Sequence, residues 1–492
     1  MSDHPNVVVL IFDTLRYDYL SCYGNNIHTP AFDEVANSGV LFESAFACGP
    51  GTPISHAALY SGQYPSGNGV TENGVTGQHI PLPDDIPLIT TWLSDRDYDT
   101  FGITGPAKMG SDWGYDRGFD ELYEHYYEFP SLTSPRAILK SLKDPKFGKY
   151  FFRQLTKGGA DSTRFKFDLL QDRIESRLDN PFYALVNFTT VHGPYDPPRP
   201  YKEQATPGFS RPRWNFLEYL ADNRGKIDNP NVRLDRVMNA QTSDGIGKFL
   251  ADPSYLNDAE IKVLRDWYTA CVEYLNDEFK SFLDFYKREL QEDTILILTA
   301  DHGEQFGEHD LLVHSHYLFD ETLQVPLLMM GPGIPEGVRR TDLVSLVDLF
   351  DTICDLCKLD QPYSTSGQSM FGGDERDAVF MEYGTRNVDY FKKSEYARYL
   401  SDEQLLQFSA GRKGIRTDKY LFTITSNDTE RLYENPEQNK IENPPENIVQ
   451  PLRERLVNTL SEEFNMWPEG DSDRMRVDTQ VEQNLRQLGY ID

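Results

Sequence analysis

Two short, continuously apolar runs constrain the fold more than any other feature of this sequence. They are Val7–Phe12, with the sequence VVVLIF, and Thr294–Thr299, with the sequence TILILT. A strand that is apolar at every position is buried on both faces, as in a parallel sheet that helices cover on both sides. Each run leads within two residues into an aspartate, Asp13 and Asp301. The pattern predicts two buried strands whose ends carry acidic side chains.

Helical patterns precede the other predicted strands. A helix over 167–178 precedes a strand over 182–188, and a helix over 88–94 precedes a strand over 99–103. A long amphipathic helix over 258–287 leads to the strand that begins at Thr294. Strands that alternate with helices predict an α/β domain, in which ligands lie beyond the carboxyl ends of the strands.

The pattern changes near the end of this α/β region. Residues 413–425 alternate as strands do, and 448–464 has the pattern of a helix. We therefore predict a catalytic domain over 1–376 and a C-terminal subdomain over 377–492, with a small antiparallel sheet and a helix.

The net charge limits the kinds of partner. The chain has 48 Lys and Arg against 78 Asp and Glu, a formal charge of −30. Nucleic-acid binding is disfavoured, because such proteins need a basic surface. An acidic surface also suits a protein kept soluble in concentrated salt, so a halophilic source is one interpretation. An anionic substrate would need local positive charge, most simply a divalent metal ion.

Cysteine usage and hydropathy bear on location. The chain has five cysteines, an odd number, and Cys354 and Cys357 are interpreted as two buried cysteines. No segment has the basic start of a signal peptide, and no apolar run is long enough to span a bilayer. We expect a cytoplasmic protein with no membrane span. Nothing in the sequence indicates its oligomeric state.

Acidic and imidazole groups at predicted strand ends suggest a metal site. Asp13 follows the first strand, and Asp301 and His302 follow the late one. Carboxylates with one imidazole suit Ca²⁺, Mg²⁺ or Mn²⁺. Taken singly, Asp13 equally suits a helix N-cap, and His302 equally suits an ordinary loop histidine.

One segment carries a resemblance to a known family. Residues 37–70 have the sequence NSGVLFESAFACGPGTPISHAALYSGQYPSGNGV. This resembles the N-terminal region of the sulfatase family in the alkaline phosphatase superfamily, with its core motif Cys-x-Pro-Ser-Arg. The stretch AALYSGQYP over 57–65 sets the alignment. By this resemblance Thr52 occupies the nucleophile position, Ser55 matches the Ser, and His56 replaces the Arg.

The resemblance continues along the chain. FTTVHGPYDPP over 188–198 is similar to the family's His-x-Pro segment and implies that His192 contacts the ester group. TADHGEQFGEHD over 299–310 is similar to its Asp-His-Gly-Glu stretch. The implied fold is alkaline phosphatase-like: a mixed, mostly parallel sheet flanked by helices, with a smaller C-terminal α+β subdomain. The family also implies one divalent ion, Ca²⁺ by resemblance, with Mg²⁺ and Mn²⁺ as alternatives; its implied ligands are Asp13, Thr52, Asp301 and His302.

The sequence departs from the family at several positions. Threonine cannot give the family's formylglycine aldehyde, because its Cβ carries a methyl group, so we expect Thr52 to be unmodified. Thr14 stands where many members have a second Asp. The family's first active-site Lys has only a weak substitute, Lys108. Its later Lys falls on Ser315, which is flanked by histidines at 314 and 316.

Histidines are the candidates for the lost positive charge and for proton transfer. We predict catalytic roles for His56, His192 and His316 beside Thr52. His309 and His314 are equally well interpreted as solvated loop histidines.

The leading functional hypothesis is metal-dependent hydrolysis of a sulfate ester through Thr52. The alternatives are a phosphomonoester or phosphodiester hydrolase or a phosphotransferase using the same residue, and a non-catalytic protein that binds an anionic ligand. The expected substrate is a small anionic ester, such as a sulfated or phosphorylated sugar, a lipid headgroup or an aryl ester. Its identity depends on irregular loops over 129–226, which have no interpretable pattern.

Overall fold

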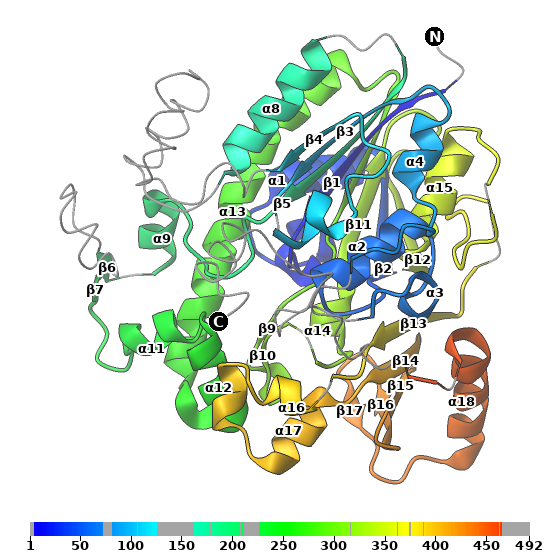
Figure 1. Ribbon diagram of the computed structural model, residues 1–492. Coiled ribbons are helices and arrows are strands. Elements are labelled where there is room, and N and C mark those ends of the chain that lie inside the picture. The colour runs from blue at the N-terminus through cyan, green and yellow to red at the C-terminus, as the bar shows by residue number, and fades with distance from the viewer. Residues whose placement is uncertain are drawn as a thin grey trace.

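The structure is a computed structural model. It describes residues 4–71, 81–105, 107–124, 162–176, 180–206, 208–210, 226–314, 316–361, 363–372, 375–386, 388–461 and 463–464. Its centre is an eight-stranded sheet, parallel except where β11 runs against both of its neighbours (Figure 1). In spatial order the strands are β12 (Val338–Ser345), β2 (Val40–Phe46), β11 (Gln324–Met330), β8 (Thr294–Thr299), β1 (Asn6–Phe12), β5 (Phe182–Phe188), β3 (Asp99–Thr104) and β4 (Glu121–Glu124).

Helices cover both faces of this sheet. Figure 1 shows α8 (Thr163–Glu175) and α13 (Asp258–Glu289) on one side and α2 (Thr52–Ser61), α4 (Ile89–Ser94) and α15 (Asp348–Leu356) on the other. Every residue of β8, and every residue of β1 after Asn6, is buried. The α/β prediction is therefore confirmed, with the two apolar runs at the centre of the sheet.

The remaining helices and small strands surround this frame. They are α1 (Pro30–Ser38), α3 (Pro65–Asn68), α9 (Arg199–Ala205), α11 (Leu234–Asn239), α12 (Ser243–Ala251), α14 (Asp320–Leu323), α16 (Val388–Phe391), α17 (Asp402–Ser409), β6 (Phe209–Ser210), β7 (Lys226–Ile227), β9 (Gln305–Phe306) and β10 (Leu312–Val313). Short 3₁₀ helices include η3 (Ala107–Met109) and η6 (Glu308–Asp310).

Local sequence signals explain the longest helix. Asn257 caps α13, and its side chain and that of Glu260 exchange hydrogen bonds with each other's backbone N–H. Lys287 and Arg288 in the last turn complement the negative end of the helix dipole. The helix begins where predicted and ends two residues later than predicted. It delivers the chain to β8.

Other predicted boundaries differ by a few residues. The strand over 294–299 is confirmed in full, whereas α8 begins at Thr163, before the predicted start at 167, and its last residue is Glu175. The C-terminal helix α18 (Glu446–Leu460) ends before 464, because Ser461 has a left-handed φ of 61°.

A second, antiparallel sheet follows the first. Its order, β13-β14-β15-β16-β17, is the order of the sequence, and α18 packs against β14 and β15. The strands are β13 (Ala378–Tyr383), β14 (Arg412–Thr417), β15 (Tyr420–Thr425), β16 (Glu430–Glu434) and β17 (Asn439–Lys440). Because this sheet begins at Ala378, we keep the division at 376/377 as a proposal.

Two further expectations concern cysteines and membranes. None of the five cysteines, all of which the structure describes, forms a disulfide bond, and Cys354 and Cys357 are buried, as predicted. Within the described ranges, none of the helices combines the length and the apolar character that crossing a bilayer requires.

Candidate active site

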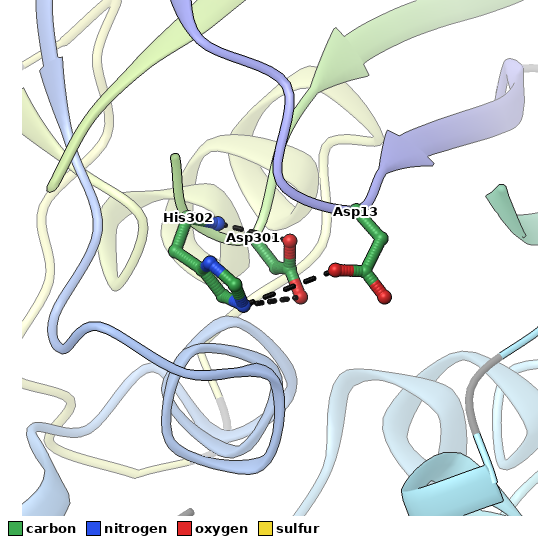
Figure 2. Close-up of side chains that lie close together, drawn as sticks. All are labelled: Asp13, Asp301 and His302. Carbon is green, nitrogen blue, oxygen red and sulfur yellow. Dashed lines mark hydrogen bonds and ion pairs between the residues drawn. The ribbon is translucent and has the colours of Figure 1, made fainter. Parts of the chain in front are cut away.

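Three of the predicted metal ligands meet at one edge of the sheet. Asp13 follows β1, and Asp301 and His302 follow β8, which lies beside β1 and parallel to it. Figure 2 shows the three side chains converging from these two strand ends. His302 Nε2 lies 3.8 Å from Asp13 Oδ1 and 3.6 Å from Asp301 Oδ2. One potential ligand atom from each of the three residues lies within 4.8 Å of those of the other two.

The hydrogen bonding of these residues suits a bound cation. Both carboxylate oxygens of Asp13 and Oδ2 of Asp301 are buried and have no hydrogen-bond partner among the described residues. Asp301 Oδ1, in contrast, accepts from the backbone N–H of Thr14 at 3.2 Å and of His302 at 2.9 Å. Unpaired buried carboxylate oxygens are costly unless a cation neutralises them. The donor set therefore fits a divalent metal ion.

The tautomer of His302 fits the same interpretation. Its Nδ1 lies 2.9 Å from the carbonyl oxygen of Gly303. A carbonyl only accepts, so Nδ1 carries the proton and the lone pair of Nε2 is directed toward the two carboxylates. Burial also lowers the pKa of His302, which keeps the imidazole in the neutral form that ligates metals.

The two aspartates differ in their electrostatics. Burial, and then the charge of Asp301, raise the pKa of Asp13 well above its ordinary value. Burial acts in the same direction on Asp301, but His302, His56 and two backbone N–H groups outweigh it and lower the pKa of Asp301. A cation therefore competes with a proton for Asp13, so cation affinity should rise with pH.

Thr52 lies beside this cluster as the first residue of α2. Its Oγ1 is 3.3 Å from His302 Nε2, and the residue is buried. Ser55 points elsewhere, because its Oγ donates to the carbonyl oxygen of Gly49 at 2.8 Å. The structure thus brings Thr52, and not Ser55, to the predicted metal ligands.

His56 contacts both Thr52 and the cluster. Its Nδ1 lies 2.9 Å from the carbonyl oxygen of Thr52 and 3.6 Å from Asp301 Oδ2. Its Nε2 lies 3.0 Å from Asn187 Nδ2 on β5, a residue that no sequence motif marked. Burial lowers the pKa of His56.

Thr14 has a structural role at the end of β1. Its φ is 64°, an unusual value for a β-branched residue. Oγ1 donates to the carbonyl oxygen of Val191 at 2.9 Å, and the carbonyl of Thr14 accepts from Tyr268 Oη at 2.7 Å. Its backbone N–H is the group that donates to Asp301. Thr14 therefore holds the turn that presents Asp13.

A second group of polar residues adjoins the cluster. His314 lies with its ring centroid 4.4 Å from that of His302 and 5.3 Å from that of His192. Its Nδ1 is 3.1 Å from Glu304 Oε1, and Tyr195 donates to Glu304 Oε2 at 2.9 Å. The interpretation of His314 as a solvated loop residue is wrong, because only 13% of its side chain is exposed.

Burial dominates the ionisation of this group. It raises the pKa of Glu304 to about 7 and, together with His192, lowers the pKa of His314 to about 3. Burial also lowers the pKa of His192, and the charge of Lys108 acts in the same direction on both histidines. Lys108, buried on η3, thus lies within electrostatic reach of His192 and His314.

His316 and His309 each contact residues outside the group formed by His192, Glu304 and His314. His316 Nδ1 contacts the carbonyl oxygen of Phe408 at 3.3 Å and Arg386 Nη1 at 3.4 Å, both beyond β13 in the chain. Its neighbour His314 is the residue whose ring adjoins His302. His309 stacks on Phe319, with ring centroids 3.8 Å apart.

Some predicted features lie outside the described residues. Ser315 is one of them, and so are 125–161 and 211–225, which make up much of the predicted substrate loops.

Comparisons with known proteins agree with this geometry. The sulfatase family profile matches residues 5–359. An uncharacterized sulfatase of Escherichia coli is 25% identical over 395 residues, covering 78% of this chain and 74% of its own. A delta 4,5-hexuronate-2-O-sulfatase of Bacteroides thetaiotaomicron is 24% identical over 374 residues, covering 75% of this chain and 71% of its own.

The fold is also that of a solved hydrolase. A phosphonate monoester hydrolase of Agrobacterium radiobacter superimposes with a TM-score of 0.67 at 21% identity, covering 93% of this chain and 95% of its own. Sulfatases normally hold a divalent metal ion, and the Asp13, Asp301 and His302 cluster is suited to one.

Proposed function

This chain belongs to the sulfatase family, and on that premise we propose that it hydrolyses a sulfate ester with Thr52 as the nucleophile. One observation supports this most directly. Thr52 Oγ1 lies 3.3 Å from His302 Nε2, at a site where three buried carboxylate oxygens have no hydrogen-bond partner in the part of the chain that the structure describes. A hydroxyl group beside a cation site is the arrangement that nucleophilic attack on an anionic ester requires.

We propose that Asp13, Thr52, Asp301 and His302 hold one divalent cation. Calcium is our first choice, with Mg²⁺ and Mn²⁺ as alternatives, because carboxylate and hydroxyl oxygens dominate the donor set. Such an ion would lower the pKa of the Thr52 hydroxyl and neutralise charge on the ester oxygens.

The reaction has two steps. Thr52 Oγ1, after losing its proton to solvent, attacks the sulfur atom, and the bond between sulfur and the alcohol oxygen breaks. The alcohol oxygen takes a proton from a protonated imidazole, for which His192 is our candidate, because the negative charge of a bound ester opposes the effect of burial on its pKa. Water then attacks sulfur, the bond to Oγ1 breaks, and sulfate leaves. Of the two protons of that water, one returns to His192 and the other to Thr52 Oγ1.

Phosphate or phosphonate esters are the second candidate substrates. An unmodified threonine can transfer a phosphoryl group by the same two steps. The fold shared with a phosphonate monoester hydrolase is compatible with this alternative. For the alcohol we propose a sugar, since one relative is a hexuronate-2-O-sulfatase.

A substrate panel tests the proposal. Aryl sulfate, aryl phosphate and aryl phosphodiester are each assayed with Ca²⁺, Mg²⁺ or Mn²⁺, in low and in molar salt. We expect the sulfate to be the best substrate. A higher kcat/KM for either phosphorus ester would favour the second candidate.

The nucleophile is tested by substitution and mass spectrometry. Thr52→Ala should lower kcat by at least about 10³-fold, because no neighbouring group replaces a covalent nucleophile. Ser55→Ala is the matched control on the same helix, and it should cost far less. Peptide mass spectrometry with a slow substrate should place a sulfo adduct on Thr52. An adduct or an oxidation on Ser55, or normal turnover by Thr52→Ala, contradicts the assignment.

A further inference from the structure

A buried line of hydrogen bonds runs from α8 to Thr52. Lys166 Nζ, on α8, donates to the carbonyl oxygen of Asn187 at 2.8 Å. Asn187 Nδ2 lies 3.0 Å from His56 Nε2, and His56 Nδ1 lies 2.9 Å from the carbonyl oxygen of Thr52. All four residues are buried, Lys166 and Asn187 each with 1% exposed. The line joins α2 to α8 and β5, two neighbouring elements that come much later in the sequence.

The start of this line is fixed by close packing. A Cβ atom at Gly105, just after β3, would lie 2.4 Å from Lys166 Nζ and 3.1 Å from the carbonyl oxygen of Asn187. A side chain at this position would therefore force the end of Lys166 to shift away from its present contact. The backbone of Asn187 is held between this contact and its pairing with Ile11 of β1.

The direction of each hydrogen bond follows from the groups involved. The carbonyl oxygen of Thr52 only accepts, so His56 Nδ1 carries the proton. In the neutral ring Nε2 then has a lone pair, which accepts from the amide of Asn187. The amide thus supports the tautomer in which His56 donates to Thr52, by donating to the other ring nitrogen.

The side chain of Asn187 is held at a cost. Its Oδ1 is buried and has no hydrogen-bond partner among the described residues. Leaving a buried acceptor unpaired is unfavourable, by about 1–3 kcal/mol in typical cases. An amide needed only to fill space would be replaceable by an apolar side chain of the same size at no such cost. The presence of the amide is therefore best explained by the hydrogen bond that its Nδ2 donates to His56.

We propose that Asn187 is a positioning residue, which acts through His56 to hold the first turn of α2 so that Thr52 Oγ1 faces His302 Nε2. This inference rests on the proposed role of Thr52. It adds a residue on β5 to a site whose recognised motifs lie at the ends of β1 and β8 and on α2.

Kinetics of Asn187→Leu test the inference. The variant keeps the branching and the number of heavy atoms of the side chain but removes the donor. We expect kcat to fall about 10- to 100-fold, as small misplacements of reacting groups do, with KM unchanged. The matched control is Asn276→Leu, because Asn276 is an equally buried amide whose Oδ1 accepts from the backbone N–H of Ala31. The control should lower the melting temperature and leave kcat unchanged. A normal kcat in Asn187→Leu overturns the inference.

Imidazole nitrogen NMR gives a readout that does not depend on activity. In protein labelled with ¹⁵N-histidine, with His56 assigned by His56→Gln, the proton should lie on Nδ1, and Asn187→Leu should shift the Nε2 resonance, because that nitrogen loses the hydrogen bond from the amide. A wild-type ring protonated at Nε2, or an Nε2 resonance unchanged in Asn187→Leu, overturns the inference even if that variant is unstable.

The experiments distinguish a failure of the proposed function from a failure of the proposed role of Asn187. Activity retained in Thr52→Ala removes the proposed function. An inactive Thr52→Ala combined with a fully active Asn187→Leu removes only the role of Asn187.

Discussion

The imidazole ring of His314 covers that of His302, with their centroids 4.4 Å apart. His302 is a proposed metal ligand, whereas His314 bonds to the buried carboxyl group of Glu304 at 3.1 Å. A pair of ionisable groups therefore adjoins the metal cluster without belonging to it. The ring of His314 also contacts that of His192, the residue that we propose to contact the ester group.

We expect His314 and Glu304 to act as one unit. His314→Gln and Glu304→Gln should each lower kcat, and the double variant should be no worse than the poorer single variant. The coupling energy from the double-mutant cycle should be about 1 kcal/mol or more, as for residues in one hydrogen-bonded network. His309→Gln is the control, because His309 stacks on Phe319 and should leave kcat unchanged. Additive effects of the two substitutions on kcat would show that the contact between His314 and Glu304 does not contribute to catalysis.

Cation binding should depend on Asp301. Asp301→Asn removes charge from Oδ2, which is buried and has no hydrogen-bond partner among the described residues. The affinity for Ca²⁺, measured by titration calorimetry, should fall by more than the roughly 10- to 100-fold typical of losing an outer partner of a metal ligand. Activity should be lost with it. Asp355→Asn serves as a control at an exposed carboxylate that bonds Ser369. Full cation occupancy in Asp301→Asn would place the ion elsewhere.

The metal-free protein should become less stable as pH rises from 4.5 to 7. Burial raises the pKa of Glu304 from 4.5 to about 7, so the folded state holds a proton that the unfolded state has lost within this window. The free energy of unfolding therefore falls across it, and Asp13, whose pKa is also raised, adds to the fall. Urea unfolding in the presence of a chelator measures the slope. Glu304→Gln should flatten it, and equal slopes in the two proteins would contradict the assignment.

A buried ion pair outside the site should affect the stability of the fold but not the binding of calcium. Arg376 Nε donates to Asp348 Oδ2 at 3.0 Å, and Asp348 also accepts from the backbone N–H of Ser345 and Gln368. Arg376→Met leaves that carboxylate buried without its cation, so the free energy of unfolding should drop by about 3–5 kcal/mol. The calcium affinity of the folded variant should match the wild type. A weaker affinity would link this pair to the site.

The parts of the fold that could be predicted are those with local signals. The apolar runs of β1 and β8 and the capped, amphipathic α13 each have their pattern within one segment. Asp13, Asp301 and His302 were found because each directly follows such a segment. Strand order has no comparable local signal. Asn187 meets His56 only because β5 lies beside β1, and the sequence around it does not indicate that neighbour.

The histidines after β9 show a second limit. Counting along the chain could not distinguish His314 from His316. Val313 and His316 have φ values of 61° and 78°, which turn the backbone out of a regular strand. Neighbouring side chains therefore do not alternate as they would in a strand, and only the three-dimensional structure shows that His314 adjoins His302.

The central place of β1 has a consequence for how the protein is made. Asn6 bonds to Thr294, a partner 288 positions further along the chain. During synthesis β1 cannot pair with β8 until almost the whole catalytic region has emerged from the ribosome. Strand pairing across so long a sequence separation is also slow. Until then Asp13 has neither Asp301 nor His302 beside it. The proposed cation site therefore forms only after β8 has been made and has paired with β1.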